Sequence, residues 1–383
     1  MRGPEVSQSS IFSYMSIEDR IPQDHPLRAM RRLLDPLLAD MSPRFAALYS
    51  RTGRPSIPPE QLLRALLLQI LYTIRSERQL MEQLDYNLLF RWFVGLNPDD
   101  AIWVPTVFTK NRDRLLEGDI ADAFFNAVLK RADAHALLSH EHFTVDGTLL
   151  EAWASHKSFR PIDEQKLPPP DDTSGEGGSP VPASAPASSN PQVNFRGEKR
   201  SNVTHRSVTD PDARLARKSH NTTSMLCYQA SVVTENRHGL IVQTDIRSPS
   251  FDAERDAGLE MLTMLEPAGR RPRRSRTLGG DKGYDTDDFV DGVRALGFTP
   301  HISPNVHSRR FRSTIDGRTL RHAGFAISQR KRKLVEEGFG WGKVVGVLRK
   351  LHHRGRRLVS WIFTFTSAAY NLVRLRRLLE PIA

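Results

Sequence analysis

The chain has almost no cysteine. Of its 383 residues only Cys227 carries a thiol. One thiol forms no internal disulfide and no zinc site built on several cysteines, which fits a reducing compartment and leaves oxygen ligands for any metal ion. We expect Cys227 to be a buried residue of a strand.

Long hydrophobic runs are also lacking. The two longest uncharged, apolar-rich runs are residues 65–74 and 358–373, and both are shorter than the roughly 20 residues that a membrane-spanning helix needs. Residues 1–21 lack the apolar stretch of a signal peptide. We therefore expect no membrane association and a cytoplasmic protein, associated with the nucleoid if its partner is DNA.

Acidic residues are scarce in the last fifth of the chain. Residues 301–383 contain 18 Lys or Arg against 4 Asp or Glu, whereas the whole chain has a net charge of +11. This segment therefore carries all of the basic excess. Such an excess favours a polyanionic partner, although a solvated basic face has the same composition.

Residues 1–135 are predicted to form a helical, DNA-binding domain. Ser76 and Gln79 have the spacing of a capping box ahead of a helix with apolar residues at 80, 84, 88 and 92. A helix over residues 106–116 carries Lys110 and Arg112, and another covers 119–134. Consecutive short helices permit a helix-turn-helix arrangement, but any small helical bundle has the same pattern.

The pattern changes to alternating strands and helices after residue 135. Residues 136–160 are predicted to form the first part of a catalytic core, 161–200 a flexible insert rich in Pro, Ser and Gly, and 201–383 the remainder with basic C-terminal helices. The strands are expected at 142–146, 224–235, 240–246, 276–280 and 299–302. Helices are expected at 252–265 and from a cap at Asp285 to Gly297. This order predicts an α/β fold, a ribonuclease-H-like mixed sheet.

Three acidic residues stand where that fold would gather them. Asp146 ends the first strand, Asp281 follows the fourth strand, and Glu336 lies on a late helix. Phosphodiester chemistry with two Mg²⁺ ions needs a cluster of hard oxygen ligands. The joint placement of these residues, rather than any one of them, predicts a metal site.

The late helix also places cations beside its carboxylate. At roughly 100° per residue, Arg332, Glu336 and Lys343 lie within about 40° of one another on a helical face. Such a stripe suits a DNA end whose phosphates are held near the metal ions, although an exposed ion pair has the same spacing. Glycines at 338, 340, 342 and 346 oppose a regular helix, and close packing against the sheet or DNA would account for them.

These residues resemble those of the insertion-sequence DDE transposases, in the branch called insertion sequence family five. That branch has a Tyr, Arg, Glu, Lys signature with two, three and six residues between successive members, and Arg332, Glu336 and Lys343 match its last three positions. Similar stretches are GRPSIPPEQLLRALLL from residue 53, FTVDGTLLEAWAS from 143, SNVTHRSVTDPDARLARK from 201 and DKGYDT from 281.

The resemblance implies roles for particular residues. Asp146, Asp281 and Glu336 would be the catalytic, metal-binding triad with two Mg²⁺ or Mn²⁺ ions, and Arg332 and Lys343 would contact DNA phosphates. Gln329 occupies the signature's Tyr position, where it can hydrogen-bond a phosphate but offers no ring to stack.

Our hypothesis is a DNA transposase that cuts and joins strands at terminal inverted repeats and in target DNA, as a homodimer or higher oligomer. One alternative is a catalytically decayed transposase that acts only as a DNA-binding protein. A second alternative is a structure-specific nuclease that cleaves without strand transfer.

Overall fold

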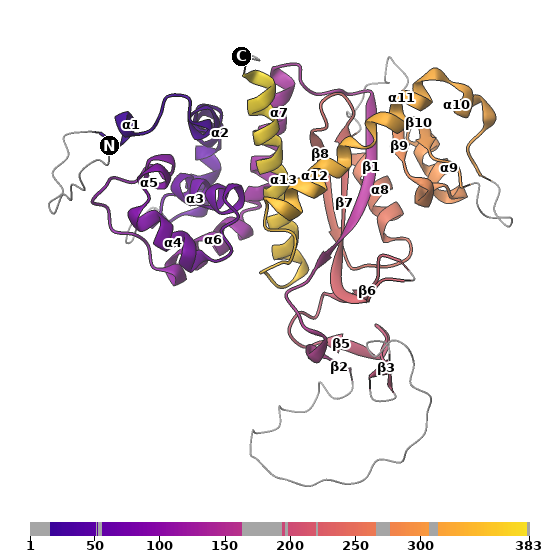
Figure 1. Ribbon diagram of the computed structural model, residues 1–383, viewed down its shortest axis with the longest axis horizontal. Helices are drawn as coiled ribbons and strands as arrows, with labels where there is room; N and C mark the ends of the chain where they lie inside the picture. Colours follow the sequence, from indigo (N-terminus) through magenta and orange to yellow (C-terminus); the bar gives the residue numbers. More distant parts are fainter. Residues whose placement is uncertain are drawn as a thin grey trace, which may run out of the picture. The chain divides into compact units, whose positions relative to one another are not determined.

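The computed structural model describes residues 16–50, 52, 56–162, 194–195, 198–219, 221–265, 276–305 and 313–380 (Figure 1). The chain divides into two compact units. The N-unit comprises residues 1–69 and 74–115, and the C-unit comprises residues 70–73 and 116–383. The division falls before the helix over residues 120–134, which the sequence assigned to the N-terminal domain.

The described part of the N-unit is helical. Its elements are α1 (Ile17–Arg20), α2 (Pro26–Leu48), α3 (Pro59–Leu71), α4 (Glu77–Tyr86), α5 (Leu88–Val94) and α6 (Pro105–Glu117). The Ser76 hydroxyl accepts a hydrogen bond from the backbone N–H of Gln79 at 3.1 Å, as the capping-box spacing predicts. The apolar stripe that follows does not form one helix, because Asn87 caps a new helix by accepting from the N–H of Phe90.

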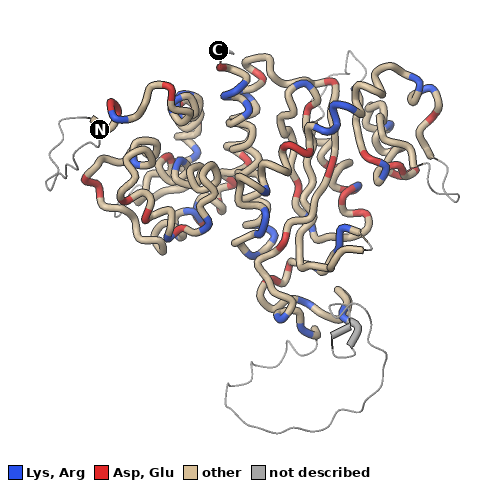
Figure 2. The backbone as a smooth tube through the Cα atoms, viewed as in Figure 1, with Lys and Arg blue, Asp and Glu red and all other residues tan. Residues whose placement is uncertain are grey.

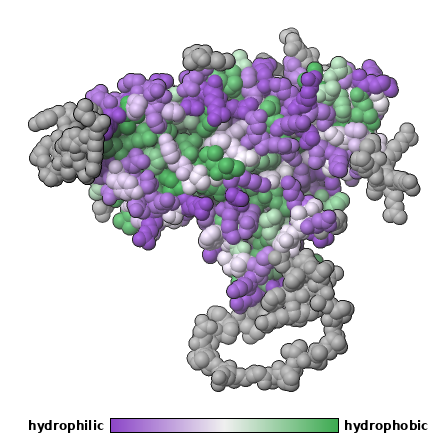
Figure 3. Space-filling model, viewed as in Figure 1, coloured by the Kyte–Doolittle hydropathy of each residue, from purple (hydrophilic) through white to green (hydrophobic). Residues whose placement is uncertain are grey.

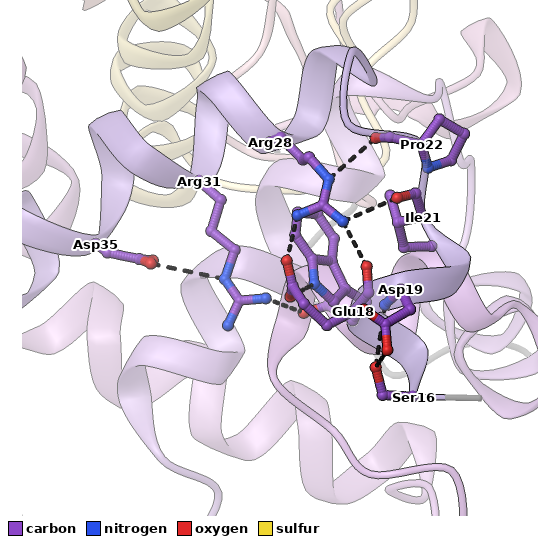
Figure 4. Close-up of polar contacts among 9 residues, drawn as sticks. Ser16, Glu18, Asp19, Ile21, Pro22, Arg28, Arg31 and Asp35 are labelled. Carbon is purple, nitrogen blue, oxygen red and sulfur yellow. Dashed lines mark hydrogen bonds and ion pairs between the residues drawn. The ribbon is translucent and has the colours of Figure 1, made fainter. Parts of the chain in front are cut away.

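Arginines of the N-unit hold its helices together from inside. Arg28 donates to the carbonyls of Pro22 and Ile21, pairs with Glu18 and lies over the Trp92 ring (Figure 4). Arg91 is 2% exposed and donates to the carbonyls of residues 84, 85, 97 and 100. Because a guanidinium has five N–H donors in a fixed fork, one buried arginine can satisfy several helix ends at once.

The C-unit is built on strands and helices in the predicted alternation. Its strands are β1 (His142–Glu151), β2 (Phe159–Pro161), β3 (Asn194–Phe195), β4 (Glu198–Lys199), β5 (His205–Ser207), β6 (Arg214–Ala216), β7 (Met225–Glu235), β8 (Ile241–Arg247), β9 (Arg276–Gly280) and β10 (Phe298–Ile302). Its helices are α7 (Ile120–Ala134), α8 (Ala253–Met264), α9 (Asp287–Ala295), α10 (Gly317–Arg321), α11 (Ala323–Lys331), α12 (Leu334–Val344) and α13 (Arg356–Leu379).

The main sheet has the order β10-β9-β1-β7, and both β8 and β6 pair with β7. Strands β1, β7 and β8 form an antiparallel meander, whereas β1, β9 and β10 are parallel. Three meandering strands followed by two parallel strands on the other side of β1 are the topology of a ribonuclease-H-like core. The predicted fold class is therefore confirmed, and Cys227 is a buried residue of β7 as expected.

Helices cover both faces of this sheet. On one face, Val145 and Leu278 pack with residues of α8 and α9 such as Met261 and Phe289. On the other, α13 runs along β8, where the Asn371 side chain bonds both the N–H and the carbonyl of Ile241 (Figure 1). Because this side chain joins the helix to the strand backbone by two hydrogen bonds in addition to apolar contacts, their relative position is fixed.

The Pro-rich insert leaves and rejoins the core beside two short ladders. Strand β2 pairs with β5, and β3 pairs with β4. Residues 163–193, the greater part of the predicted insert, lie outside the described residues. The two residues of β3 and two of β4 show that its last part is extended chain.

In the described ranges, no helix is both long and apolar enough to span a bilayer. Hydrophilic side chains make up much of the face seen in Figure 3.

A buried carboxylate closes the turn between β7 and β8. Glu235 is 0% exposed, and its two oxygens accept hydrogen bonds from the backbone N–H groups of Ser139, Arg237, His238 and Leu240. Removing such an acceptor leaves several buried donors unsatisfied at once.

We predict that Glu235→Ala lowers the free energy of unfolding by about 2 to 5 kcal/mol. Thermal and denaturant unfolding of the full chain will measure this. Glu260→Ala is the control, because that carboxylate is largely exposed and pairs with Arg247. Equal stability of the two variants would contradict the assignment.

Candidate active site

The site lies where two neighbouring parallel strands part. The pairing of β1 with β9 ends at Thr144 and Gly279, while β1 remains paired with β7 as far as Glu151. Asp146 and Asp281 each stand two residues beyond the last paired position. The open end between diverging strands of an α/β sheet is where such folds bind ligands.

Asp146 is a partly buried carboxylate in a crowded acidic environment. One of its oxygens accepts from the N–H of Gly147 at 2.9 Å. The pKa of Asp146 is raised to about 7, chiefly by burial and also by the charges of Glu254 and Asp281, while the hydrogen bond from Gly147 and the charge of Arg332 oppose the rise. Near neutral pH a cation bound here would favour the ionised carboxylate.

Asp281 is held by the turn that it begins. Its Oδ1 accepts a hydrogen bond from the N–H of Gly283 at 2.7 Å, so it caps the short helical turn formed by residues 282–284. Asp285, in contrast, does not cap α9 as predicted. Its carboxylate instead accepts from the N–H groups of Asn305 and Thr314, and the N-cap of α9 is Thr286.

A third carboxylate beside these two was missed in the sequence. Glu254 lies in the first turn of α8, and its Oε1 accepts a 2.6 Å hydrogen bond from the hydroxyl of Tyr284. Burial raises the pKa of Glu254, and Asp281 adds to this, whereas the Tyr284 hydrogen bond opposes it. The only local signal was an acidic residue at the start of a helix, a position that such residues commonly occupy as caps.

The stripe predicted on one late helix, formed by Arg332, Glu336 and Lys343, is distributed over two helices in the structure. Arg332 is the C-cap of α11, and Glu336 and Lys343 lie on α12. The Lys343 ammonium donates to the Thr148 hydroxyl at 2.5 Å, and burial lowers the pKa of Lys343. Thr148 is on the same face of β1 as Asp146, so α12 stands over the face that carries this carboxylate. Glu336 is exposed. Along the chain, basic residues come directly before the acidic first turn of α12 (Figure 2).

Close packing accounts for most of the helix glycines. An added Cβ would lie 3.3 Å from Ile241 at Gly338, 2.9 Å from Leu348 at Gly342 and 2.6 Å from a backbone oxygen at Gly346. A Cβ at Gly340 would meet nothing within 4 Å. Backbone therefore excludes a side chain at Gly346, whereas at Gly338 and Gly342 the neighbouring Ile241 and Leu348 side chains would have to shift, and nothing in the structure explains Gly340.

Gln329, in the signature's Tyr position, is engaged at both ends of its amide. Its Nε2 donates to the carbonyl of His301 at 2.5 Å, and its Oε1 accepts from the Ser303 hydroxyl at 2.7 Å. These bonds tie α11 to the carboxyl end of β10. They direct the amide into the protein rather than toward a phosphate.

The two cations assigned to α6 differ in placement. Lys110 is exposed, whereas Arg112 is 8% exposed and pairs with Glu77 and Asp113. An arginine paired with two carboxylates holds helices together and is poorly suited to contact DNA.

The carboxylates fit a divalent metal ion by the chemistry of their donors. Asp146, Asp281 and Glu254 offer hard oxygen atoms, which Mg²⁺ and Mn²⁺ prefer. Across the described ranges, no three His, Cys, Asp or Glu side chains already stand close enough together to hold an ion. The three carboxylates are therefore candidate ligands that do not yet form a finished site.

A ribonuclease-H-like sheet with acidic residues past its diverging strands defines an enzyme of phosphodiester chemistry. Residues 15–114 match the family model described as "Transposase domain (DUF772)", and residues 201–372 match the "Transposase DDE domain". The chain belongs to the DDE transposases, enzymes that cleave DNA strands and transfer them and that use divalent metal ions. This confirms the DDE transposase assignment and the activity inferred from the sequence, and the family-five branch stays a prediction.

Solved structures of transposases are similar to the chain at low sequence identity. A piggyBac transposase synaptic complex with hairpin DNA is 9% identical with a TM-score of 0.42, over 92% of this chain and 75% of that one. A Mos1 transposase paired-end complex with the left transposon end is 12% identical with a TM-score of 0.20, over 78% and 80%. No curated protein matches the chain in sequence.

The raised pKa of Asp146 predicts how stability depends on pH. Folding raises this pKa from 3.8 to about 7, so the folded protein binds the proton more tightly than the unfolded chain does. The stability contributed by the protonated carboxyl is complete below about pH 4 and is lost as pH rises to about 7. At pH 8 the ionised, metal-free site therefore costs on the order of a few kcal/mol.

We predict that Asp146→Asn raises the melting temperature of the metal-free protein at pH 8 and changes it little at pH 4. Melting curves of both proteins across this range will test the prediction, with Asp288→Asn as an exposed control. A stabilisation independent of pH would show that the carboxylate charge is not its cause.

Proposed function

We propose that this transposase holds two Mg²⁺ or Mn²⁺ ions with Asp146, Asp281 and Glu336, as in insertion sequence family five. The observation that carries the proposal is the parting of β1 and β9, which brings Asp146 and Asp281 to one gap. In this proposal Glu336 would join them from α12, the helix whose Lys343 contacts Thr148 on the Asp146 face of β1.

When bound, the ions would activate water or a 3′-hydroxyl and stabilise the leaving oxygen. The protein's own residues bind and orient the DNA strand. Arg332, whose positive charge acts on Asp146, and Lys343, beside Thr148, would hold the phosphates next to the carboxylates. These cations also offset the repulsion between an acidic site and the DNA backbone.

Terminal inverted repeats and target DNA are the proposed partners. The exposed residues Arg330, Lys331 and Lys333 extend the basic surface from Arg332 along the end of α11, and Lys110 is an exposed cation of the N-unit. Pairing two transposon ends requires two active sites, so we propose a homodimer or a higher oligomer on DNA.

We predict that Asp281→Asn abolishes Mn²⁺-dependent nicking of inverted-repeat DNA, a loss of at least about 100-fold, because the metal loses a ligand. Glu336→Gln should have the same effect. Its neighbour Glu337, which pairs with Arg374 at 2.8 Å, provides the matched control Glu337→Gln, which should retain nicking.

A gel-shift assay on the same DNA separates catalysis from binding. All of these variants should bind the repeats like the wild type. Nicking by Asp281→Asn at the wild-type rate would refute the metal site, while binding without nicking by the wild type itself would indicate the decayed, DNA-binding alternative.

The proposed contact between Lys343 and a DNA phosphate can be tested by measuring how DNA affinity depends on salt concentration. We predict that Lys343→Gln weakens DNA binding and lowers the slope of log affinity against log salt concentration by about 1, because one phosphate contact is lost. Lys350→Gln is the control, since Lys350 pairs with Glu151 at 2.9 Å. An unchanged slope for Lys343→Gln would exclude the contact.

A further inference from the structure

The start of α8 is tied to the turn that carries Asp281. The Tyr284 hydroxyl donates to Glu254 at 2.6 Å, and the Arg255 guanidinium donates to the carbonyl of Gly283 at 3.3 Å. Gly283 in turn donates its N–H to Asp281. These bonds join the first turn of α8 to the turn of residues 281–284 and so place Glu254 with respect to Asp281.

Glu254 also lies close to β1. A Cβ built on Gly147 would lie 2.7 Å from the Glu254 carboxyl carbon and 2.5 Å from the Gln229 amide nitrogen. Real Cβ atoms do not approach other atoms so closely, so Glu254 occupies the space that a side chain at position 147 would fill. Gly147 follows Asp146 directly and lies on the opposite face of β1, so the Glu254 carboxyl lies against the face of the strand opposite the Asp146 side chain.

The side-chain hydrogen bonds of Glu254 do not require its charge. Tyr284 is 1% exposed and donates its single hydroxyl hydrogen to Oε1, and Gln229 reaches Oε2 only at 3.5 Å. The carbonyl oxygen of a glutamine would accept from Tyr284 as well as a carboxylate does. A glutamine would also avoid the repulsion from Asp281 that raises the pKa of Glu254, although Arg255 and the N–H of Gly147 favour the carboxylate.

We propose that Glu254 is a further metal-binding carboxylate of the transposase site, reaching the ions from α8 with its Oε2 atom. Tyr284 is the positioning residue that fixes Oε1. This inference rests on the proposed metal site of Asp146 and Asp281 and adds a ligand from the face of the sheet opposite α12.

The test measures Mn²⁺ binding by the full-length protein without DNA, by calorimetry and by the electron paramagnetic resonance signal of free Mn²⁺. We expect Glu254→Gln to weaken Mn²⁺ binding by at least about tenfold and not to lower the melting temperature of the metal-free protein. Tyr284→Phe keeps the charge but frees the carboxylate, so its loss should be smaller, with folding checked by circular dichroism. Glu260→Gln, an exposed acid of the same helix, should bind like the wild type.

Two parallel variants separate this inference from the metal site itself. If Asp146→Asn and Asp281→Asn weaken binding while Glu254→Gln does not, Glu254 is not a ligand and the proposed function survives. If none of the three weakens binding, the metal site is wrong altogether. Glu254→Asp, which keeps the charge one methylene shorter, supplies the same comparison should Glu254→Gln fail to fold, and wild-type affinity in that variant would overturn the inference.

Discussion

The pairing of β1 on both of its sides is the constraint on which the site depends. Antiparallel pairing with β7 continues to Glu151, whereas parallel pairing with β9 ends at Thr144. The strand therefore stays in the sheet while its neighbour turns away, and a gap opens that hydrogen bonds no longer close. Residues at the edge of this gap are fixed by the sheet but remain open to a ligand, which is the condition for precise metal binding.

Much of this architecture was predictable from the sequence because its signals are local. The run at 276–280 is a strand with the predicted limits, and Gly297, with a φ of +78°, stands at the end of α9. The prediction that Asp285 caps α9 was wrong. An aspartate that caps a helix and one that accepts hydrogen bonds from a distant loop have the same local sequence. Glu254 could not be found, since its neighbours come from Gly147 and Tyr284, which only the folded sheet brings together.

Charge in the sequence translates poorly into a DNA-binding surface. The N-unit has many arginines, yet Arg28, Arg91 and Arg112 direct their guanidinium groups to carbonyls and carboxylates within the unit. The helix-turn-helix expectation for residues 1–135 therefore gains no support from its arginine content. The end of α11 differs, because Arg330, Lys331 and Lys333 are all exposed. Exposure, and not the number of basic residues, decides which segment can attract phosphate groups.

A remote motif supports the helix that carries Glu336. In the stretch TDPDAR, Asp210 is 0% exposed and accepts from the Tyr228 hydroxyl and the N–H of Gly355, while Asp212 accepts from the N–H of Arg356. These two aspartates satisfy the first donors of α13, where the helix dipole also favours negative charge.

Helix α13 then positions α12. Its Tyr370 ring lies 5.7 Å from that of Trp341, and its Arg374 pairs with Glu337 at 2.8 Å. Gly338 allows this closeness, since an added Cβ there would touch both Ile241 and Tyr370. The glycines that seemed to oppose a helix, and the acidic motif far from them in the sequence, thus serve one end: they hold α12, the helix that carries Glu336, in place over β1.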